Sequence, residues 1–187
     1  MRRKRDGGIK YLTEEEIEAL FSVIKDVRDR ALFRLIYHRG LRASEPGLLQ
    51  LHDWHPETER LTVHRLKGSI TAPFRLTSIE SNALRAWLRK RGTAAGPIFL
   101  SRNHKPISSA RVNELMHVYS AKAGLPAEKS HPHALKHSCG THVLAKLCDI
   151  TLVQDHLGHA NIRSTMEYAR VVNPSRERAA AQLRDWK

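Results

Sequence analysis

Five basic side chains and one tyrosine stand at positions where each could act on a phosphate. Arg42 follows Gly40 in the stretch Gly-Leu-Arg-Ala-Ser-Glu, just before a predicted short helical turn. A guanidinium beside free backbone N–H groups at a helix start suits a phosphate oxygen, and Glu45 is near enough in sequence to orient it. Lys67 is at the tip of a predicted hairpin, where a lysine can reach into a groove and donate a proton. Taken singly, each of these residues also fits an ordinary surface position.

The densest group of such residues lies in His-Pro-His-Ala-Leu-Lys-His, residues 131–137. His133, Lys136 and His137 are spaced i, i+3 and i+4, so a helix presents them on one face as donors for an anion. Two histidines at i and i+4 could instead share a zinc ion. No glutamate stands at the position that a metalloprotease helix requires, and the two cysteines of the chain lack zinc spacing. We therefore predict no metal site, and a structural role for His137 stays open.

A third feature is Leu157-Gly158-His159, followed nine residues later by Tyr168. A Gly-His turn between two helices presents an imidazole at their junction. A tyrosine at the end of the next helix is usually a half-buried anchor. It can instead attack phosphorus where cations stabilise the phenolate and the charge on the phosphate. The sequence offers no paired carboxylates, which disfavours a two-metal nuclease.

Composition points to a polyanionic partner. The 187 residues include 32 Lys and Arg against 19 Asp and Glu, a net charge of +13. A domain this basic usually binds nucleic acid, and a non-specific binder fits the charge as well. No apolar run approaches the roughly 20 residues of a membrane span, and the basic N-terminus lacks the apolar stretch of a secretory signal. Two cysteines exclude a disulfide scaffold and fit a reducing, intracellular setting.

The hydrophobic pattern predicts one mainly α-helical domain with a small antiparallel sheet, an α+β fold. Thr13 and Glu16 form a capping-box pattern at the first helix. Residues 61–66 and 71–76 predict a hairpin around the turn 67–69, with Pro73 marking an edge strand. Further helices are expected at 31–38, 78–90, 108–124, 133–147, 150–156, 162–168 and 174–186.

In this order and spacing, the motifs around these residues resemble the catalytic domain of the tyrosine recombinases, also called the phage integrase family. The resemblance covers residues 12–172, and segments 131–140 and 152–168 are most similar to the short invertases that switch fimbrial promoters. It implies a tyrosine recombinase or type IB topoisomerase-like catalytic domain at 12–172. A basic arm would precede it at 1–11, and a helical tail would follow it at 173–187.

The resemblance implies a role for each residue of the motifs. Arg42 would grip the scissile phosphate, and Lys67 would protonate the 5′-oxygen as it leaves. His133 would act in proton transfer around the nucleophile. His159 would bind a phosphate oxygen, and Tyr168 would attack to give a 3′-phosphotyrosyl link to DNA.

At one position this chain departs from the family pattern. The family usually has a second arginine where Lys136 stands, so the charge is kept but the planar two-pronged grip on phosphate is lost. Glu45 and His137 would support the site. No cofactor is implied, because the covalent link stores the phosphodiester energy for religation.

The expected function is site-specific DNA recombination by integration, excision or inversion, as in a mobile element or a promoter switch. A weakened or inactive DNA-binding protein of the same fold and a topoisomerase-like DNA-relaxing enzyme are the alternatives. The expected partner is double-stranded DNA, bound by a homo-tetramer; without DNA the protein could be a monomer, and its oligomeric state there stays open. The expected place is the cytoplasm of a bacterium, at the nucleoid, with no membrane contact.

Two further expectations concern DNA and subunit contacts. The side chains expected to contact DNA outside the reacting site are Arg2, Arg3, Lys4, Arg5 and Arg65. The tail, with an apolar face at Leu183 and Trp186, would either dock on a neighbouring protomer or pack on its own domain.

Overall fold

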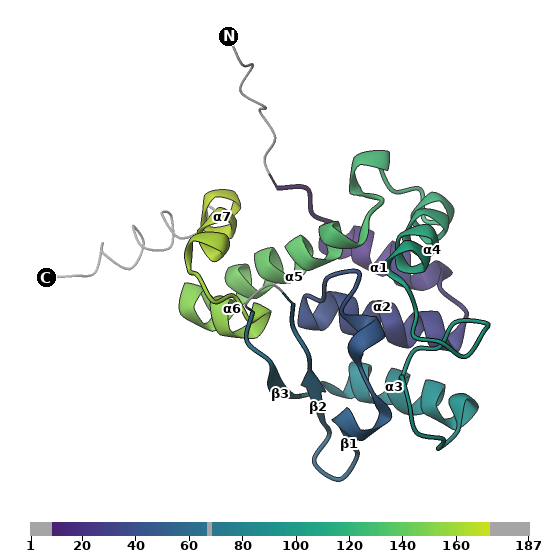
Figure 1. Ribbon diagram of the computed structural model, residues 1–187. Helices are drawn as coiled ribbons and strands as arrows, with labels where there is room; N and C mark the ends of the chain where they lie inside the picture. The colour runs from purple at the N-terminus through teal and green to yellow at the C-terminus, as the bar shows by residue number, and fades with distance from the viewer. Residues whose placement is uncertain (1–8, 67–68, 173–187) are drawn as a thin grey trace, which may run out of the picture.

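The computed structural model describes residues 9–66 and 69–172 (Figure 1). Within these ranges the chain forms seven α-helices and three short strands. The helices are α1 (Glu14–Val23), α2 (Val27–Arg39), α3 (Ser78–Arg91), α4 (Ser109–Lys122), α5 (Pro132–Leu147), α6 (Ile150–Leu157) and α7 (Arg163–Val171). The strands are β1 (Trp54–His55), β2 (Arg60–Val63) and β3 (Ala72–Arg75), and single 3-10 turns lie at Pro46–Leu48, Leu51–Asp53 and Ala127–Lys129. The predicted α+β class is confirmed.

Helix α2 runs through the middle of the molecule and packs against α3 and α5 (Figure 1). Its side chains Leu32, Phe33, Leu35 and Ile36 are fully buried in the main core. A second, smaller core lies between α5, α6 and α7, where Cys139, Leu144, Val153 and Leu157 surround Tyr168. The chain therefore places Tyr168 inside a core cluster rather than on an open helix face.

The predicted start of the first helix is confirmed. The Thr13 hydroxyl accepts from the Glu16 N–H at 3.3 Å, and the Glu16 carboxylate accepts from the Thr13 N–H at 2.8 Å. Helix α2, however, begins at Val27, four residues before the expected start. Asp26 caps it by accepting from the Asp29 N–H at 2.9 Å. Asp29 itself is buried, and the Tyr119 hydroxyl and Arg28 Nε each donate to its carboxylate at 2.8 Å.

The three strands form one antiparallel sheet in the order β1-β2-β3, beside α3 (Figure 1). Pro73 pairs with Thr62 on the outer strand β3, as the edge-strand prediction requires. The hairpin is shorter than predicted, because residues 64–66 lie outside the ladder. The Arg65 N–H donates to the Thr71 hydroxyl at 3.2 Å, and the Leu66 N–H donates to the Glu45 carboxylate at 3.2 Å.

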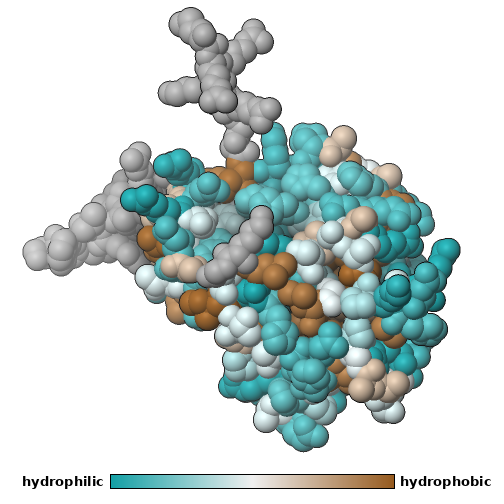
Figure 2. Space-filling view, viewed as in Figure 1, coloured by the Kyte–Doolittle hydropathy of each residue, from teal (hydrophilic) through white to brown (hydrophobic). Residues whose placement is uncertain are grey.

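The expected helix at 174–186 and the arm at 1–8 lie outside the described residues. The other expected helices are present, and apart from the start of α2 their ends lie within three residues of the expected ones. None of the helices in the described ranges is long and apolar enough to cross a membrane. The face drawn in Figure 2 is mainly hydrophilic, with its hydrophobic side chains in smaller groups.

Candidate active site

Arg42 lies in the turn that follows α2. The helix ends at Gly40, whose φ of 57° is the left-handed conformation that favours glycine. Arg42 Nη1 donates to Glu45 Oε1 at 2.8 Å, to the Leu66 carbonyl at 3.1 Å and to Ser69 Oγ at 3.1 Å. Within the described part of the chain, Nη2 and Nε of Arg42 keep no hydrogen-bond partner. The side chain is 26% exposed, so its unused edge is available to an anion.

Glu45 is the buried anchor of this arginine. Its fully buried carboxylate also accepts from the Arg42 backbone N–H at 2.8 Å, from Leu66 N–H at 3.2 Å and from Arg65 Nη1 at 3.3 Å. Burial opposes ionisation of this carboxyl. The hydrogen bonds from Arg42 and Leu66 and the charge of Arg65 outweigh it and lower the pKa of Glu45. Glu45 is therefore an anion that holds Arg42 in one orientation.

Lys136 projects from α5 into the same region. Only 2% of this residue is exposed, and its Nζ donates to the Gly40 carbonyl at 2.7 Å. Burial, together with the charges of Arg65 and Arg42, lowers the pKa of Lys136 to about 7. Its positive charge is therefore sensitive to pH near neutrality.

Tyr168 lies on α7 with its ring against α5. It is 2% exposed, and a Cβ atom added to Gly140 would come within 2.5–2.7 Å of three atoms of its ring. The glycine is thus what lets the ring approach the helix so closely. His159 lies in the turn before α7, where its ring stacks near that of Tyr168 with centroids 6.4 Å apart. Its Nδ1 is 3.0 Å from the Thr165 hydroxyl.

The Tyr168 hydroxyl is 3.3 Å from Nδ1 of His137. Burial raises the pKa of Tyr168, as do Cys139 and Glu167, while the charge of Arg42 lowers it. Burial and the neighbouring histidines and Lys136 lower the pKa of His137 to about 4, so its imidazole is neutral at pH 7. A neutral imidazole carries its proton on one of its two nitrogens, and in the tautomer with Nδ1 unprotonated His137 accepts the hydrogen bond of the phenol.

The spacing i, i+4 expected on α5 is realised at His133 and His137, whose ring centroids are 4.2 Å apart. The His133 residue is exposed overall, but neighbouring protein atoms partly exclude water from its ring, and this desolvation together with the charge of Lys136 lowers its pKa. The sequence assigned proton transfer to His133 and only support to His137. The structure places His137, not His133, beside the hydroxyl. Spacing alone could not separate them, because both lie on one face of the helix.

Site residues from the first and the last part of the chain lie close together. Burial and the charges of Lys136 and Arg42 lower the pKa of His159 to about 4, which puts these groups within electrostatic reach of one another. The structure thus brings together Arg42, Glu45, His133, Lys136, His137, His159 and Tyr168. Lys67 and the residues Arg2, Arg3, Lys4 and Arg5 lie outside the described residues. No group of three or more His, Cys, Asp or Glu side chains that could hold a metal ion occurs in the described ranges.

Arg65 does not lie where the sequence placed it. Its side chain is 0% exposed, and its guanidinium bonds to the carbonyls of Arg39, Gly40 and His156 and to Glu45. A guanidinium enclosed in this way cannot reach a DNA backbone in this structure, so the expected surface contact is wrong here. Net charge gives no sign of such burial.

A mainly helical domain that gathers an arginine, a lysine, three histidines and a tyrosine in one basic site has the composition of a phosphoryl-transfer enzyme. Comparison with known proteins specifies the class. Residues 10–174 match the family described as "Phage integrase family". The chain therefore belongs to the phage integrase family, and the resemblance drawn from its motifs is confirmed.

Three relatives illustrate the similarity. The chain is 32% identical over 170 residues to the type 1 fimbriae regulatory protein FimE of Escherichia coli K12, covering 85% of this chain and 84% of FimE. It is 36% identical over 167 residues to tyrosine recombinase XerA of Pyrococcus furiosus, covering 87% of this chain and 57% of XerA. A crystal structure of the XerH site-specific recombinase bound to its palindromic difH substrate superposes with a TM-score of 0.78 at 25% identity, covering 94% of this chain and 53% of XerH.

Proposed function

We propose that this protein is a site-specific DNA recombinase that cleaves and rejoins DNA strands through a 3′-phosphotyrosyl intermediate. The observation that carries the proposal is the position of the Tyr168 hydroxyl. It lies in one basic site with Arg42, Lys136 and His159, in a chain of the phage integrase family. The relatives support it, because one is named a tyrosine recombinase and another is a recombinase bound to DNA.

The geometry supports a division of labour in the cleavage step. The Tyr168 oxygen forms a bond to phosphorus while the bond from phosphorus to the 5′-oxygen breaks in line with it. Nδ1 of His137, 3.3 Å from the hydroxyl, takes the phenol proton. His133, whose ring lies edge-on to that of His137, is the next group on this proton path.

Phosphate charge is the other requirement of the step. Three groups supply hydrogen-bond donors to the non-bridging oxygens of the phosphate: the free edge of the Arg42 guanidinium, the Lys136 amine and the His159 imidazole. Lys67 supplies the proton that the 5′-oxygen needs. Arg42 donates to the Leu66 carbonyl and to Ser69 Oγ, on either side of the segment 67–68.

The proposal is tested with nicked suicide duplexes covering the DNA on both sides of the encoding gene. A covalent protein–DNA adduct is expected as a slower band on a denaturing gel. Absence of an adduct on all duplexes that the protein binds would favour a DNA-binding protein without cleavage activity. Relaxation of supercoiled DNA lacking any such site would favour the topoisomerase-like alternative.

We expect the cleavage rate to depend on the charge of Lys136. Its pKa of about 7 lies well below that of a free lysine, so the amine loses its charge as pH rises through neutrality. Lys136→Arg keeps a charged guanidinium at every pH tested. The variant should cleave at least as fast as wild type near pH 6, and its advantage should grow toward about pH 9. Single-turnover adduct formation across this pH range measures the ratio of the variant's cleavage rate to that of the wild type. A large loss of rate at all pH values would show that the site is built around lysine.

We expect DNA affinity to fall steeply with salt. With a net charge of +13, the protein should neutralise several phosphates and release their counterions. Raising salt from about 50 to about 200 mM should weaken binding by about 1000-fold. Fluorescence anisotropy with a labelled duplex measures the slope of log Kd against log salt. A slope near zero would contradict a backbone-dominated interface.

The assembly and cell location follow from the proposed reaction. Exchange of strands between two DNA sites needs several active subunits, so we propose a homo-tetramer on double-stranded DNA and a monomer without it. The tail at 173–187 is the segment we propose for contacts between protomers, and the arm at 1–11 for contacts with DNA. A DNA substrate places the protein in the cytoplasm, at the nucleoid.

A further inference from the structure

Arg65 has a fully enclosed charged side chain, as Glu45 and Glu80 do. It follows strand β2, and its side chain is 0% exposed. Nη2 donates to the Arg39 carbonyl at 2.6 Å and to the His156 carbonyl at 3.3 Å. Nη1 donates to the Gly40 carbonyl at 3.1 Å and to Glu45 Oε2 at 3.3 Å. A buried charge persists only with such compensation, so this environment is specific for a guanidinium.

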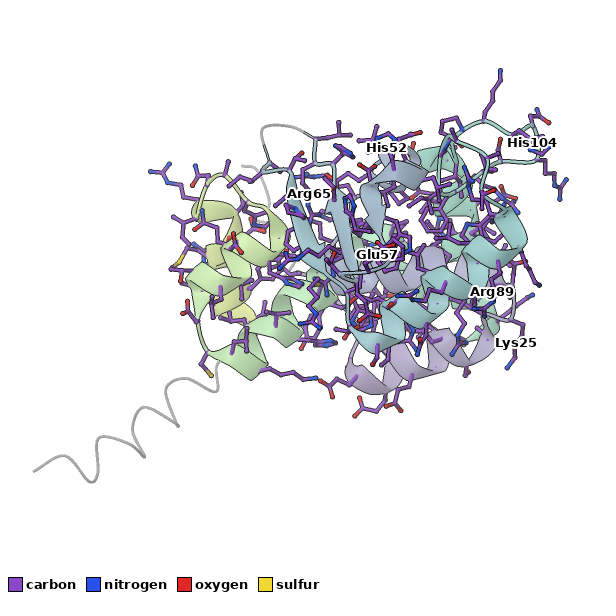
Figure 3. The ribbon with its side chains drawn as sticks, turned by 90° about the horizontal axis from the view of Figure 1, so that it is seen from below. Lys25, His52, Glu57, Arg65, Arg89 and His104 are labelled. Atoms are coloured by element: carbon purple, nitrogen blue, oxygen red, sulfur yellow. The ribbon has the colours of Figure 1, made fainter. Side chains whose placement is uncertain are left out.

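The carbonyl acceptors of Arg65 belong to the ends of two helices. Arg39 and Gly40 close α2, and His156 is in the last turn of α6. The carbonyls at a helix C-terminus have no partner within the helix and carry partial negative charge. One planar guanidinium therefore caps α2 and α6 together and fixes the distance between their ends. Figure 3 shows Arg65 at the strands, next to α5–α7, and Arg89 far from it on the opposite side.

The same acceptors also hold the groups of the proposed active site. Glu45 binds both Arg65 and Arg42, and the Gly40 carbonyl binds both Arg65 and Lys136. Arg65 is thus one shared acceptor away from each of the two cationic side chains proposed to bind phosphate.

The third link leads to His159. Helix α6, which Arg65 caps, ends at Leu157 and is followed by Gly158 and His159. A Cβ atom at Gly158 would lie 3.2 Å from Arg65 Nε, so this glycine permits the close approach. The Ile70 N–H also donates to the Gly158 carbonyl at 3.1 Å, which ties the far side of the hairpin to the same turn.

We propose that Arg65 is a positioning residue, which fixes Arg42, Lys136 and His159 relative to one another without touching DNA. The inference rests on the proposed recombinase function for its kinetic consequence. Its structural consequence is independent of DNA: Arg65 places a positive charge beside Lys136, across the Gly40 carbonyl that both side chains share.

The first test follows Lys136 in the protein without DNA. The charged or titratable groups that face its amine are Arg42, Glu45, Arg65 and Cys139, together with His133, His137 and His159. Carbon-13 NMR of the lysine Cε atoms over a pH titration reports each amine, and Lys136→Arg identifies its signal. In Arg65→Gln the Lys136 midpoint should move up from about 7 toward the ordinary lysine range, because a like charge is removed. In Arg89→Gln, which removes an exposed charge, it should not move.

The second test is kinetic, on a duplex that the wild-type protein cleaves. Arg65→Gln should slow single-turnover adduct formation by about 100-fold, because loss of alignment at a reacting centre has effects of this size. The DNA Kd should match that of Arg89→Gln. The rate ratio of variant to wild type should rise with pH, because Lys136 keeps its charge longer in the variant. A residue that only stabilised the fold would give a constant ratio in folded protein.

The outcomes separate the two proposals. If the wild-type protein forms no adduct, the recombinase function is contradicted. The Lys136 titration then tests by itself whether Arg65 places its charge beside Lys136. Wild-type cleavage with an equally fast Arg65→Gln overturns the positioning role, as does an unmoved Lys136 midpoint or a loss that appears only in DNA affinity. If Arg65→Gln does not fold, Arg65→Lys is the variant to test, because one amine cannot reach all four acceptors of the guanidinium. Slower cleavage at unchanged DNA affinity supports the positioning role of Arg65. A wild-type cleavage rate overturns it.

Discussion

Tyr168→Phe should form no covalent adduct with DNA while binding DNA as tightly as the wild-type protein. The change keeps the aromatic ring that packs on Gly140 and removes only the hydroxyl. The lost hydrogen bond, to Nδ1 of His137 at 3.3 Å, is long, and a bond of this kind stabilises a protein by about 1 kcal/mol at most. The variant should therefore fold, and its defect should be confined to chemistry.

The measurement combines a denaturing gel for the adduct with fluorescence anisotropy for affinity. Tyr11→Phe is the matched control, because Tyr11 also has an aromatic neighbour on α5, with its ring 6.2 Å from that of His142. The control should form the adduct at the wild-type rate. An adduct that persists in Tyr168→Phe would identify a different nucleophile and remove the basis of the proposed mechanism.

Arg42→Gln should slow single-turnover cleavage by about 100- to 1000-fold, the usual effect of losing one donor to a developing charge. The structure indicates that the loss is chemical rather than structural. Arg42 is partly exposed, and Glu45 keeps Arg65 and two backbone N–H groups when the Arg42 side chain is removed. The melting temperature should accordingly change little.

Arg42→Lys refines this test, since it restores the charge without the two-pronged geometry. We expect a rate between those of Arg42→Gln and the wild type. Arg89→Gln again serves as the control for a lost positive charge. A cleavage rate for Arg42→Gln close to that of the control would show that phosphate is held elsewhere.

Some of this structure could be read from sequence because it depends on neighbours along the chain. The Thr13–Glu16 capping box needs only two residues of one helical turn. The start of α2 was missed although Asp26 caps it locally, because burial of the charged Asp29 in its first turn also needs the hydroxyl of Tyr119, 90 residues away. A charged segment that looks like a loop becomes helix when a distant hydroxyl compensates its burial.

The candidate site shows the same division. Motif order identified the family and the residues that meet. Which histidine faces Tyr168 depends on how α7 packs against α5, and that register has no signature in the spacing of two residues on one face. The environment of Arg65 was equally hidden, because its acceptors come from residues 39, 40, 45 and 156.

The enclosure of Tyr168 also affects how the nucleophile reacts with small molecules when no DNA is bound. With 2% of the residue exposed and its pKa raised by burial, the phenol stays protonated and hard for small reagents to reach. Free nucleotides and inorganic phosphate therefore meet a nucleophile that is both neutral and covered. A tyrosine-selective label such as an iodinating reagent should mark Tyr168 slowly in the free protein, so a rise in labelling on mixing with DNA would report the moment at which the substrate uncovers it.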